Sequence, residues 1–212
     1  MPFALPFPTI GPDIFAVDLF GVTLALRWYA MAYIVGILIA WWMAARAVKR
    51  PALWTDGRAP ATPEQIGDVI TWVIVGIIVG GRLGFVIFYE PAYYLANPLQ
   101  IPAIWQGGMA FHGGLMGVAV AGIWYCRSQA IPLLKMADVM AYATPPALAL
   151  GRTANFINGE LWGRPSDAPW AVIFPGAAAQ DCAGPVGIVG GLCARHPSQL
   201  YEALLEGVVL CL

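Results

Sequence analysis

Apolar residues recur along the chain in five long runs, separated by shorter segments that carry most of the charges. The runs cover about residues 19–45, 69–89, 103–126, 136–150 and 198 to the end. Since about 20 apolar residues cross a hydrocarbon core of roughly 30 Å, the pattern predicts about five transmembrane helices. Pro145 and Pro146 interrupt the short fourth run, and a proline removes a bond from the helical ladder, so we expect a kink or a break there.

The composition is that of a membrane protein. Hydrophobic residues make up 59% of the 212 positions and charged residues 11%, against about 45–50% and about 25% in ordinary soluble domains. No internal repeat or linker divides the chain, so the predicted fold is all-α, a single polytopic helical membrane domain over residues 1–212. A net charge of −1 argues against nucleic acid as a partner. Residues 1–15 lack the basic start of a secretory signal, so we expect the first span to be retained.

The distribution of basic residues predicts the orientation in the membrane. Positive charges concentrate in the first and third connections, at Arg46, Lys49, Arg50, Arg58, Arg127 and Lys135. Cytoplasmic loops carry the excess of Lys and Arg, so these two connections are predicted to be cytoplasmic and the N-terminus extracytoplasmic. The segment 152–197, between the fourth and fifth spans, is then an extracytoplasmic loop.

Two cysteines lie within that loop, Cys182 and Cys193. An oxidising exterior would permit a disulfide between them that closes a short loop. The alternative is two unrelated small residues in a glycine-rich segment, and a mass shift on reduction separates the two interpretations.

Among the ionisable residues inside predicted spans, Arg82 and His112 stand out, while Arg27 is closer to the outer interface, where snorkelling explains it. A charge near the middle of a span costs about 2.5–3.5 kcal/mol on insertion scales, so each one needs a partner or a purpose. For Arg82, snorkelling or a structural ion pair is the alternative to a functional role. Five glycines surround His112, where a backbone or a lipid head group can approach closely; the alternative is helix packing around a hydrogen-bonded histidine.

Two glutamates, Glu202 and Glu206, share one face of the fifth predicted helix because they are four residues apart. Two like charges on one face in lipid do not both ionise unless cations face them. Arg82 and Arg152 are the candidate cations, and protonation of one glutamate is the alternative.

The segment 151–167 holds the densest group of polar residues, just beyond the outer end of the fourth span. If the helix continues for a turn, Arg152 and Asn155 are neighbours on its surface. Asn158 and Gly159 indicate a turn that presents Glu160 and Gly163 back toward the membrane edge. A guanidinium with amide groups suits an anionic lipid or substrate, because arginine stays charged and donates two parallel hydrogen bonds.

These residues resemble the motifs of the prolipoprotein diacylglyceryl transferase family. The similarity rests first on Gly151, Arg152, Asn155, Phe156, Asn158, Glu160 and Gly163. Four further motifs follow the family order: Arg27-Trp28-Tyr29, Gly81-Arg82-Leu83-Gly84, Phe111-His112-Gly113-Gly114 and Arg195-His196-Pro197-Ser198-Gln199-Leu200-Tyr201-Glu202. The resemblance spans nearly the whole chain.

The resemblance implies transfer of the diacylglyceryl group of phosphatidylglycerol to the lipobox cysteine of a prolipoprotein signal peptide, in the bacterial inner membrane, without a metal or cofactor. A thioether forms and glycerol phosphate leaves. His112 is then expected to be the general base or to position the thiol, Arg152 to hold the phosphate, and Tyr29 to hydrogen-bond substrate. The remaining predicted substrate-binding residues are Asn155, Asn158, Glu160, Gly163, Arg82, His196 and Glu202.

The sequence departs from the family at its C-terminal end. Family members have seven spans, and the last two bring a further functional arginine. Here the chain stops at Leu212 within the fifth. We expect a fragment rather than a degenerate copy, because the motifs are intact, and a poorly active or inactive polypeptide.

Without the resemblance, two other functions compete with the transferase. A transporter or channel for an anionic solute would line its path with Arg82, Arg152 and His112 at mid-membrane, whereas these residues are expected in the outer half. A non-catalytic lipid-binding protein would have little use for His112 and Glu160. Zinc catalysis is disfavoured because the chain has two histidines and no metal-ligand spacing.

Overall fold

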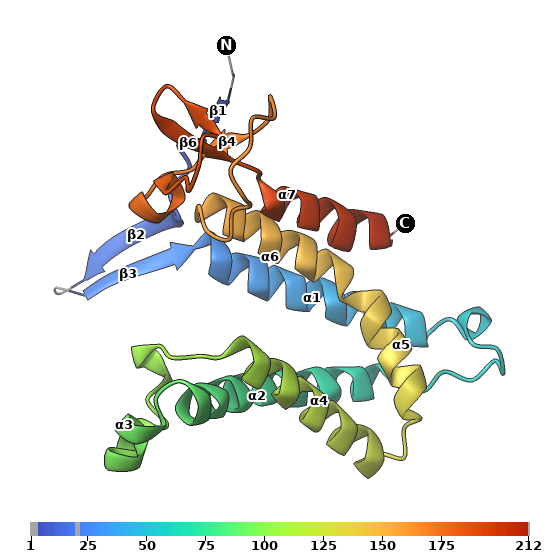
Figure 1. Cartoon of the computed structure of the whole chain (residues 1–212). Helices are drawn as coiled ribbons and strands as arrows, with labels where there is room; N and C mark the ends of the chain where they lie inside the picture. Colours follow the sequence, from blue (N-terminus) through green and yellow to red (C-terminus); the bar gives the residue numbers. More distant parts are fainter. Residues whose placement is uncertain (1–3, 20–21, 212) are drawn as a thin grey trace. The chain divides into compact units, whose positions relative to one another are not determined.

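The computed structural model describes residues 4–19 and 22–211. Most of them are helical, in α1 (Trp28–Val48), α2 (Pro63–Phe88), α3 (Pro91–Ala96), α4 (Phe111–Ser128), α5 (Leu133–Ala143), α6 (Pro145–Ile157) and α7 (Ser198–Glu202). The helix α7 continues without interruption through a π-helical stretch, Ala203–Val208, and a 3-10 turn, Val209–Cys211 (Figure 1). Short 3-10 helices cover Pro51–Leu53, Pro98–Gln100, Ile104–Gln106 and Ala177–Gln180.

The chain divides into two compact units. The first comprises Met1–Ala40 and Tyr142–Leu212, and the second comprises Trp41–Ala141. Each unit has its own close helix packing, as the glycine contacts below show.

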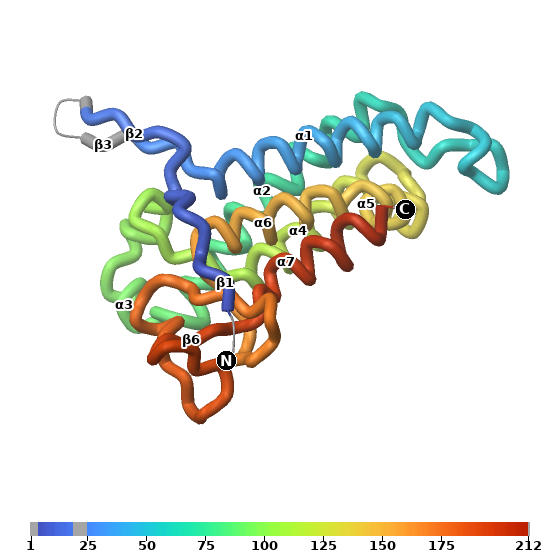
Figure 2. Tube along the Cα trace, turned by 90° about the horizontal axis from the view of Figure 1, so that it is seen from above, coloured from blue at the N-terminus to red at the C-terminus, as the bar shows by residue number. Residues whose placement is uncertain are grey.

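In the first unit, α1, α6 and α7 run side by side (Figure 2). Small residues allow this approach: a Cβ built on Gly36 would lie 3.0 Å from the Cβ of Ala147, and one built on Gly207 would lie 2.4 Å from the Cβ of Ala149. A larger residue at Gly207 would therefore force α6 and the α7 continuation apart.

Two small sheets complete the first unit. The order of the four-stranded sheet is β1 (Leu5–Pro6), β4 (Val172–Ile173), β6 (Leu192–Arg195) and β5 (Ile188–Val189), in which only β1 and β4 are parallel. The second sheet is the antiparallel hairpin of β2 (Asp13–Leu19) and β3 (Val22–Arg27). An apolar cluster of Phe7, Phe156 and Phe174 packs the β4 segment against the end of α6.

In the second unit, α2 and α4 form an antiparallel pair with their backbones in contact. A Cβ on Gly117 would lie 1.9 Å from the carbonyl oxygen of Gly76, and one on Gly113 would lie 2.3 Å from that of Gly80. The glycines recur every four residues on α2, at Gly76, Gly80 and Gly84, so they form one stripe along the helix. Packing of this kind holds helices together in lipid, where apolar contact alone offers no gain over the acyl chains.

The structure refines the predicted spans. Among the described residues, α1 and α2 are the two helices both long and apolar enough to cross a membrane, and they lie in the first and second predicted runs. The break at the fourth run is confirmed, because α5 ends at Ala143 and α6 begins at Pro145. The predicted helical continuation past Arg152 is also confirmed, since α6 runs to Ile157.

Two boundaries were wrong, and the all-α prediction was incomplete. The first run was expected to be helical from residue 19, but the chain reaches Arg27 as a β-hairpin closed by an ion pair between Arg27 and Asp13 at 3.3 Å; residues 20–21 lie outside the described residues. The third run was expected to begin at residue 103, but α4 begins at Phe111. Gly107 and Gly108 interrupt it with φ angles of 85° and 79°, which a right-handed helix does not allow.

Candidate functional site

The end of α6 gathers the polar residues of the segment 151–167 around one carboxylate. The side-chain amides of Asn155 and Asn158 both donate to Oε1 of Glu160, at 3.0 and 3.1 Å. Gly159 makes this possible because its φ of 68° turns the chain back, and the amide of Glu160 then donates to the carbonyl of Asn155 at 3.1 Å. Glu160 itself is exposed, whereas Asn155 is buried.

Arg152 forms an ion pair with Glu202, with Nε 2.7 Å from Oε2. The prediction that Glu202 needs a facing cation, with Arg152 as a candidate, is therefore confirmed. Each side chain keeps about a third of its surface exposed, at 33% and 35%. In the part of the chain that the structure describes, Nη1 and Nη2 of Arg152 donate no hydrogen bond to a protein acceptor, so the guanidinium keeps N–H groups for a further acceptor.

Three side chains form a chain of hydrogen bonds at the base of α7. The indole Nε1 of Trp170 donates to the hydroxyl of Tyr201 at 2.7 Å, and this hydroxyl lies 3.0 Å from Nδ1 of His196. An indole nitrogen can only donate, so the hydroxyl of Tyr201 accepts there; the same hydroxyl can either donate to Nδ1 of His196 or accept from it, according to the imidazole tautomer. In either case Nδ1 is engaged by Tyr201, and among the described residues Nε2 makes no hydrogen bond.

Gly163 is the point at which the α6 turn meets the α7 segment. Its amide donates to the carbonyl of His196 at 2.9 Å, and a Cβ built on Gly163 would lie 3.0 Å from both Cβ and the carbonyl oxygen of His196. The side-chain Nε2 of Gln199 adds a second link by donating to the backbone carbonyl of Glu160 at 2.5 Å. Two predicted residues far apart in sequence, Gly163 and His196, are thus brought together.

Arg195 begins one of the motifs that carry the resemblance, but the sequence assigned it no role. It is 6% exposed, its guanidinium lies 4.2 Å from the ring centre of Trp162, and its Nε donates to the carbonyl of Ala179 at 2.6 Å. Further N–H groups donate to the carbonyls of Asp181 and, at 3.4 Å, Gly163. Arg195 thereby fastens the loop to the α6 turn; its place directly before His196 was the available signal.

The same loop is closed by a disulfide between Cys182 and Cys193, as the first of the two interpretations predicted. Gln180 braces it, with its side-chain oxygen accepting from the amide of Cys193 at 2.8 Å and its side-chain nitrogen donating to the carbonyl of Phe174 at 2.7 Å.

Tyr29, in the first turn of α1, belongs to the same unit. Its hydroxyl is 3.0 Å from that of Tyr33, and the two rings meet edge to face at 4.9 Å. Glu160 and Arg152 are both close enough to interact electrostatically with the Tyr29 phenol. The first unit therefore assembles eight predicted residues: Tyr29, Arg152, Asn155, Asn158, Glu160, Gly163, His196 and Glu202.

His112 lies in the second unit, as the second residue of α4. Its side chain is exposed and contacts the ring of Phe111 edge to face at 5.6 Å. The neighbouring Gly113 is buried where α4 meets Gly80 and Gly84 of α2. The glycines around His112 thus include the helix-packing contacts that were one of the two predicted alternatives, while the imidazole remains accessible.

Arg82, also in the second unit, is 4% exposed and binds backbone carbonyls. Its Nε donates to Ile101 at 2.7 Å, Nη2 to Gln100 at 2.8 Å, and Nη1 to Gly107 at 2.5 Å and Gly108 at 3.2 Å. Tyr94 covers the guanidinium at 5.0 Å. These bonds satisfy a buried charge and fix the segment that leads into α4 and His112.

The first unit presents a partly exposed guanidinium, a group that can donate two parallel hydrogen bonds to an anionic oxygen pair. The second unit presents an accessible imidazole at a helix start, which can accept a proton.

Comparisons with known proteins agree with this chemistry. Residues 16–212 match the family described as prolipoprotein diacylglyceryl transferase. A phosphatidylglycerol–prolipoprotein diacylglyceryl transferase of Roseobacter denitrificans is 62% identical over 206 residues, 97% of this chain and 69% of the relative. The proteins of the same name from Ruegeria pomeroyi and Cereibacter sphaeroides are 60% identical over 99% of this chain and 70% of the relative, and 56% identical over 96% of this chain and 98% of the relative, respectively.

Proposed function

The chain belongs to the prolipoprotein diacylglyceryl transferase family, and on this premise we propose which of its residues carry out the transfer. It is a membrane transferase that moves the diacylglyceryl group of phosphatidylglycerol to prolipoproteins. The observation that carries the assignment is the half-buried guanidinium of Arg152, which is paired with Glu202 and lies one turn before the Asn155, Asn158 and Glu160 cluster.

In the proposed reaction, the lipobox cysteine sulfur attacks the carbon of the diacylglycerol moiety that is esterified to the phosphate. A sulfur–carbon bond forms, the carbon–oxygen bond breaks, and glycerol phosphate leaves with the bonding electron pair. The thiol proton goes to a base, because a thiol of ordinary pKa, about 8.5, is mostly protonated at neutral pH. The leaving phosphate gains negative charge, and donors already aimed at that charge lower the barrier.

Arg152 is the proposed phosphate ligand. Its ion pair with Glu202 fixes the guanidinium plane, while Nη1 and Nη2 are left for the phosphate oxygens. A planar guanidinium donates two parallel hydrogen bonds to such an oxygen pair, which a lysine cannot do. Asn155, Asn158, Glu160 and Tyr29 shape the head-group site, in which the two amides hold the Glu160 carboxylate in place.

His112 is the proposed general base or thiol-positioning group, and its support is an exposed imidazole in the first turn of α4. Gly163 and His196 shape the substrate site through their backbone contact. Arg82 was proposed to contact substrate directly. Because its N–H groups are engaged by four carbonyls, its contribution is better explained by holding the segment before His112.

We also propose five membrane spans and a site toward the outer leaflet of the bacterial inner membrane. The support is the lengths and apolar composition of α1 and α2, together with the basic residues of the first and third connections. The disulfide of the segment 152–197 agrees with an oxidising, extracytoplasmic location. The lipobox of a secreted prolipoprotein would meet the enzyme on the same side.

A direct assay tests the proposal. The purified chain in detergent micelles containing phosphatidylglycerol is given a lipobox peptide, and the diacylglyceryl mass gain is followed by mass spectrometry. We expect a gain that depends on the peptide cysteine and falls by about 10²-fold or more in Arg152→Ala, the cost typical of removing a donor to a developing charge. Full transfer by Arg152→Ala would remove it from the phosphate role, and near-normal transfer by His112→Gln would remove His112 as the base.

A further inference from the structure

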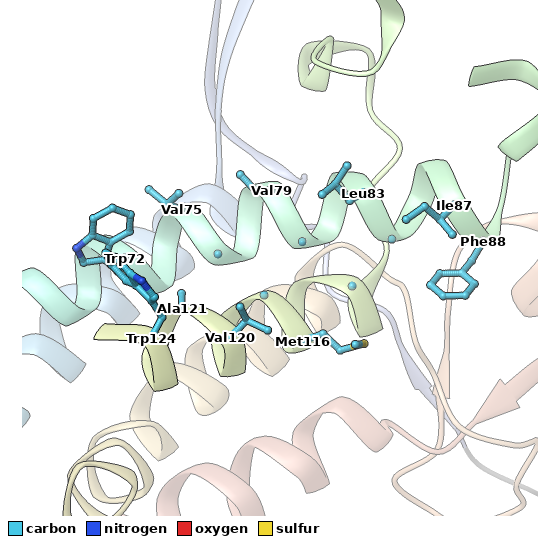
Figure 3. A pocket seen from close by; sticks show the side chains of 15 residues that line it. Trp72, Val75, Val79, Leu83, Ile87, Phe88, Met116, Val120, Ala121 and Trp124 are labelled. Atoms are coloured by element: carbon cyan, nitrogen blue, oxygen red, sulfur yellow. The ribbon is translucent and has the colours of Figure 1, made fainter. Parts of the chain in front are cut away.

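The α2–α4 pair carries an open apolar groove along its length, with a volume of about 460 Å³ (Figure 3). Val79 and Leu83 of α2 and Met116 and Val120 of α4 line it. The close glycine contacts between the two helices form its floor, because they leave no side chains to fill the space above. Val120 is 65% exposed and Met116 64% exposed, so the groove is open along one side.

The dimensions of the groove match those of a lipid tail in a membrane. Trp72 and Phe88 line its two ends, and the 16 residue-to-residue steps from one to the other span roughly 24 Å at about 1.5 Å per step. A hydrocarbon core is roughly 30 Å thick and each leaflet supplies about half of it, so the groove is longer than the depth that one acyl chain reaches and can hold such a chain. At the far end, Trp72 and Trp124 meet edge to face with ring centres 4.6 Å apart and narrow the groove.

His112 does not line the groove, but it directly precedes Gly113, which does, at the end away from Trp72. Residues 112, 116, 120 and 124 are spaced four apart on α4, so His112 begins the row of side chains that continues as the groove wall. Its neighbour Gly113 also lines the groove. A lipid whose glycerol backbone lay at the imidazole could therefore direct one acyl chain into this groove.

We propose that the α2–α4 groove is an acyl-chain subsite that receives one fatty acyl chain of the phosphatidylglycerol substrate. The proposal rests on the proposed function, in particular on the role of His112. The occupant is argued from three observations: the apolar lining, a length sufficient for one acyl chain, and an end at Gly113, directly after the proposed base. The groove holds no charged side chain, so it does not suit the peptide backbone or the head group.

The subsite acts by shape. An acyl chain leaving bulk lipid for the groove gains little hydrophobic free energy, because it exchanges one apolar surrounding for another. What the groove supplies is orientation: a chain held along α4 fixes where the reactive glycerol carbon lies relative to the imidazole. Chain length and kinks should therefore change the rate of transfer more than the affinity for the lipid.

Two matched variants on α4 test this. Val120→Trp fills the groove, whereas Leu115→Trp adds the same side chain at a 57% exposed position that does not line it. With dipalmitoyl phosphatidylglycerol in mixed micelles, we expect Val120→Trp to lower kcat/KM by about tenfold or more, the scale of a misplaced reacting group, and Leu115→Trp to leave it unchanged. Dioctanoyl phosphatidylglycerol has shorter tails, which end closer to His112. With this lipid, the fall in kcat/KM caused by Val120→Trp should be much smaller.

A labelling experiment tests the subsite without relying on turnover. Phosphatidylglycerol with a photoactivatable diazirine near the end of one acyl chain should label the groove-lining peptides of α2 and α4, and Val120→Trp should reduce this labelling while Leu115→Trp does not. Equal loss with both lipids, equal effects of both variants, or labelling of Val120→Trp at the wild-type level would overturn the proposal. Disulfide-linked dimers formed by a Met116→Cys variant would also overturn it, because they would show that a second copy of the chain occupies the groove. Absence of transfer by the unmodified chain, with labelling intact, would count against the proposed function and not against the subsite.

Discussion

A single methyl group at Gly117 should separate α2 from α4. In Gly117→Ala the new Cβ would lie 1.9 Å from the carbonyl oxygen of Gly76, and reaching an ordinary contact of 3.4 Å requires a shift of about 1.5 Å. The obstacle is backbone, which cannot rotate aside. The shift would therefore spread to the neighbouring contacts of Gly80 and Gly113.

The size of the effect follows from two opposing terms. Overpacking costs about 1–3 kcal/mol, and the extent of this clash places it near the upper end. Replacing a helical glycine with alanine stabilises the folded state by up to about 1 kcal/mol, because it reduces the backbone entropy of the unfolded chain. The net loss should be about 2 kcal/mol, which lowers the melting temperature by about 4–8 °C for a chain of this size.

Gly122→Ala, on the same helix, supplies the control, since a Cβ built on Gly122 would meet no atom within 4 Å. It should be neutral or stabilising by up to about 1 kcal/mol. Thermal unfolding of both purified variants in detergent, followed by circular dichroism, measures the difference. If Gly117→Ala melted at or above Gly122→Ala, the helices would not be in backbone contact, and the groove floor described above would not exist.

Three further changes have defined outcomes. In Arg82→Lys, the lysine ammonium cannot reach all four carbonyls at once. We therefore expect kcat to fall by about 10–100-fold through misplacement of His112, while KM for phosphatidylglycerol stays within about twofold. A raised KM with a normal kcat would instead make Arg82 a substrate ligand. Cys193→Ser should lower the free energy of unfolding by about 2–3 kcal/mol, and wild-type protein under reductant should then unfold like the variant; no change with reductant would exclude the disulfide. The Lys135 ammonium, hydrogen-bonded to Asp56 at 2.7 Å, lowers the pKa of that carboxyl. The stabilisation of the folded state by this ion pair is therefore present at neutral pH and is lost as the pH falls through the lowered pKa. Lys135→Met should raise the Asp56 titration midpoint measured by carbon NMR, and an unchanged midpoint would refute the ion pair.

The sequence predicted α1 and α2 well because both are long apolar runs with few polar interruptions. It failed at residues 19–27 because an apolar β-hairpin and the start of an apolar helix have similar composition, and only the pairing of Asp13 with Arg27 separates them. The late start of α4 depends on Gly107 and Gly108, which a hydropathy pattern counts as neutral although their backbone ends any helix.

The candidate site was predicted better where chemistry is local. The turn at Gly159 that returns Glu160 to Asn155 lies within six residues, and the sequence indicated it. Arg82 and Arg195 were harder, because their partners are backbone carbonyls that occur at every residue and are selected by the tertiary fold alone. The glycine stripe was open to prediction: the four-residue spacing of Gly76, Gly80 and Gly84 is a known sign of close helix contact.

The hydrogen-bond chain from Trp170 through Tyr201 distinguishes the two histidines of the chain. It engages Nδ1 of His196, so only Nε2 of that ring is left for a substrate atom. The His112 ring is exposed and contacts Phe111 edge to face. A substrate can therefore meet His196 in a single ring orientation, whereas the His112 ring is held by no side-chain hydrogen bond among the described residues and can turn either nitrogen toward a thiol.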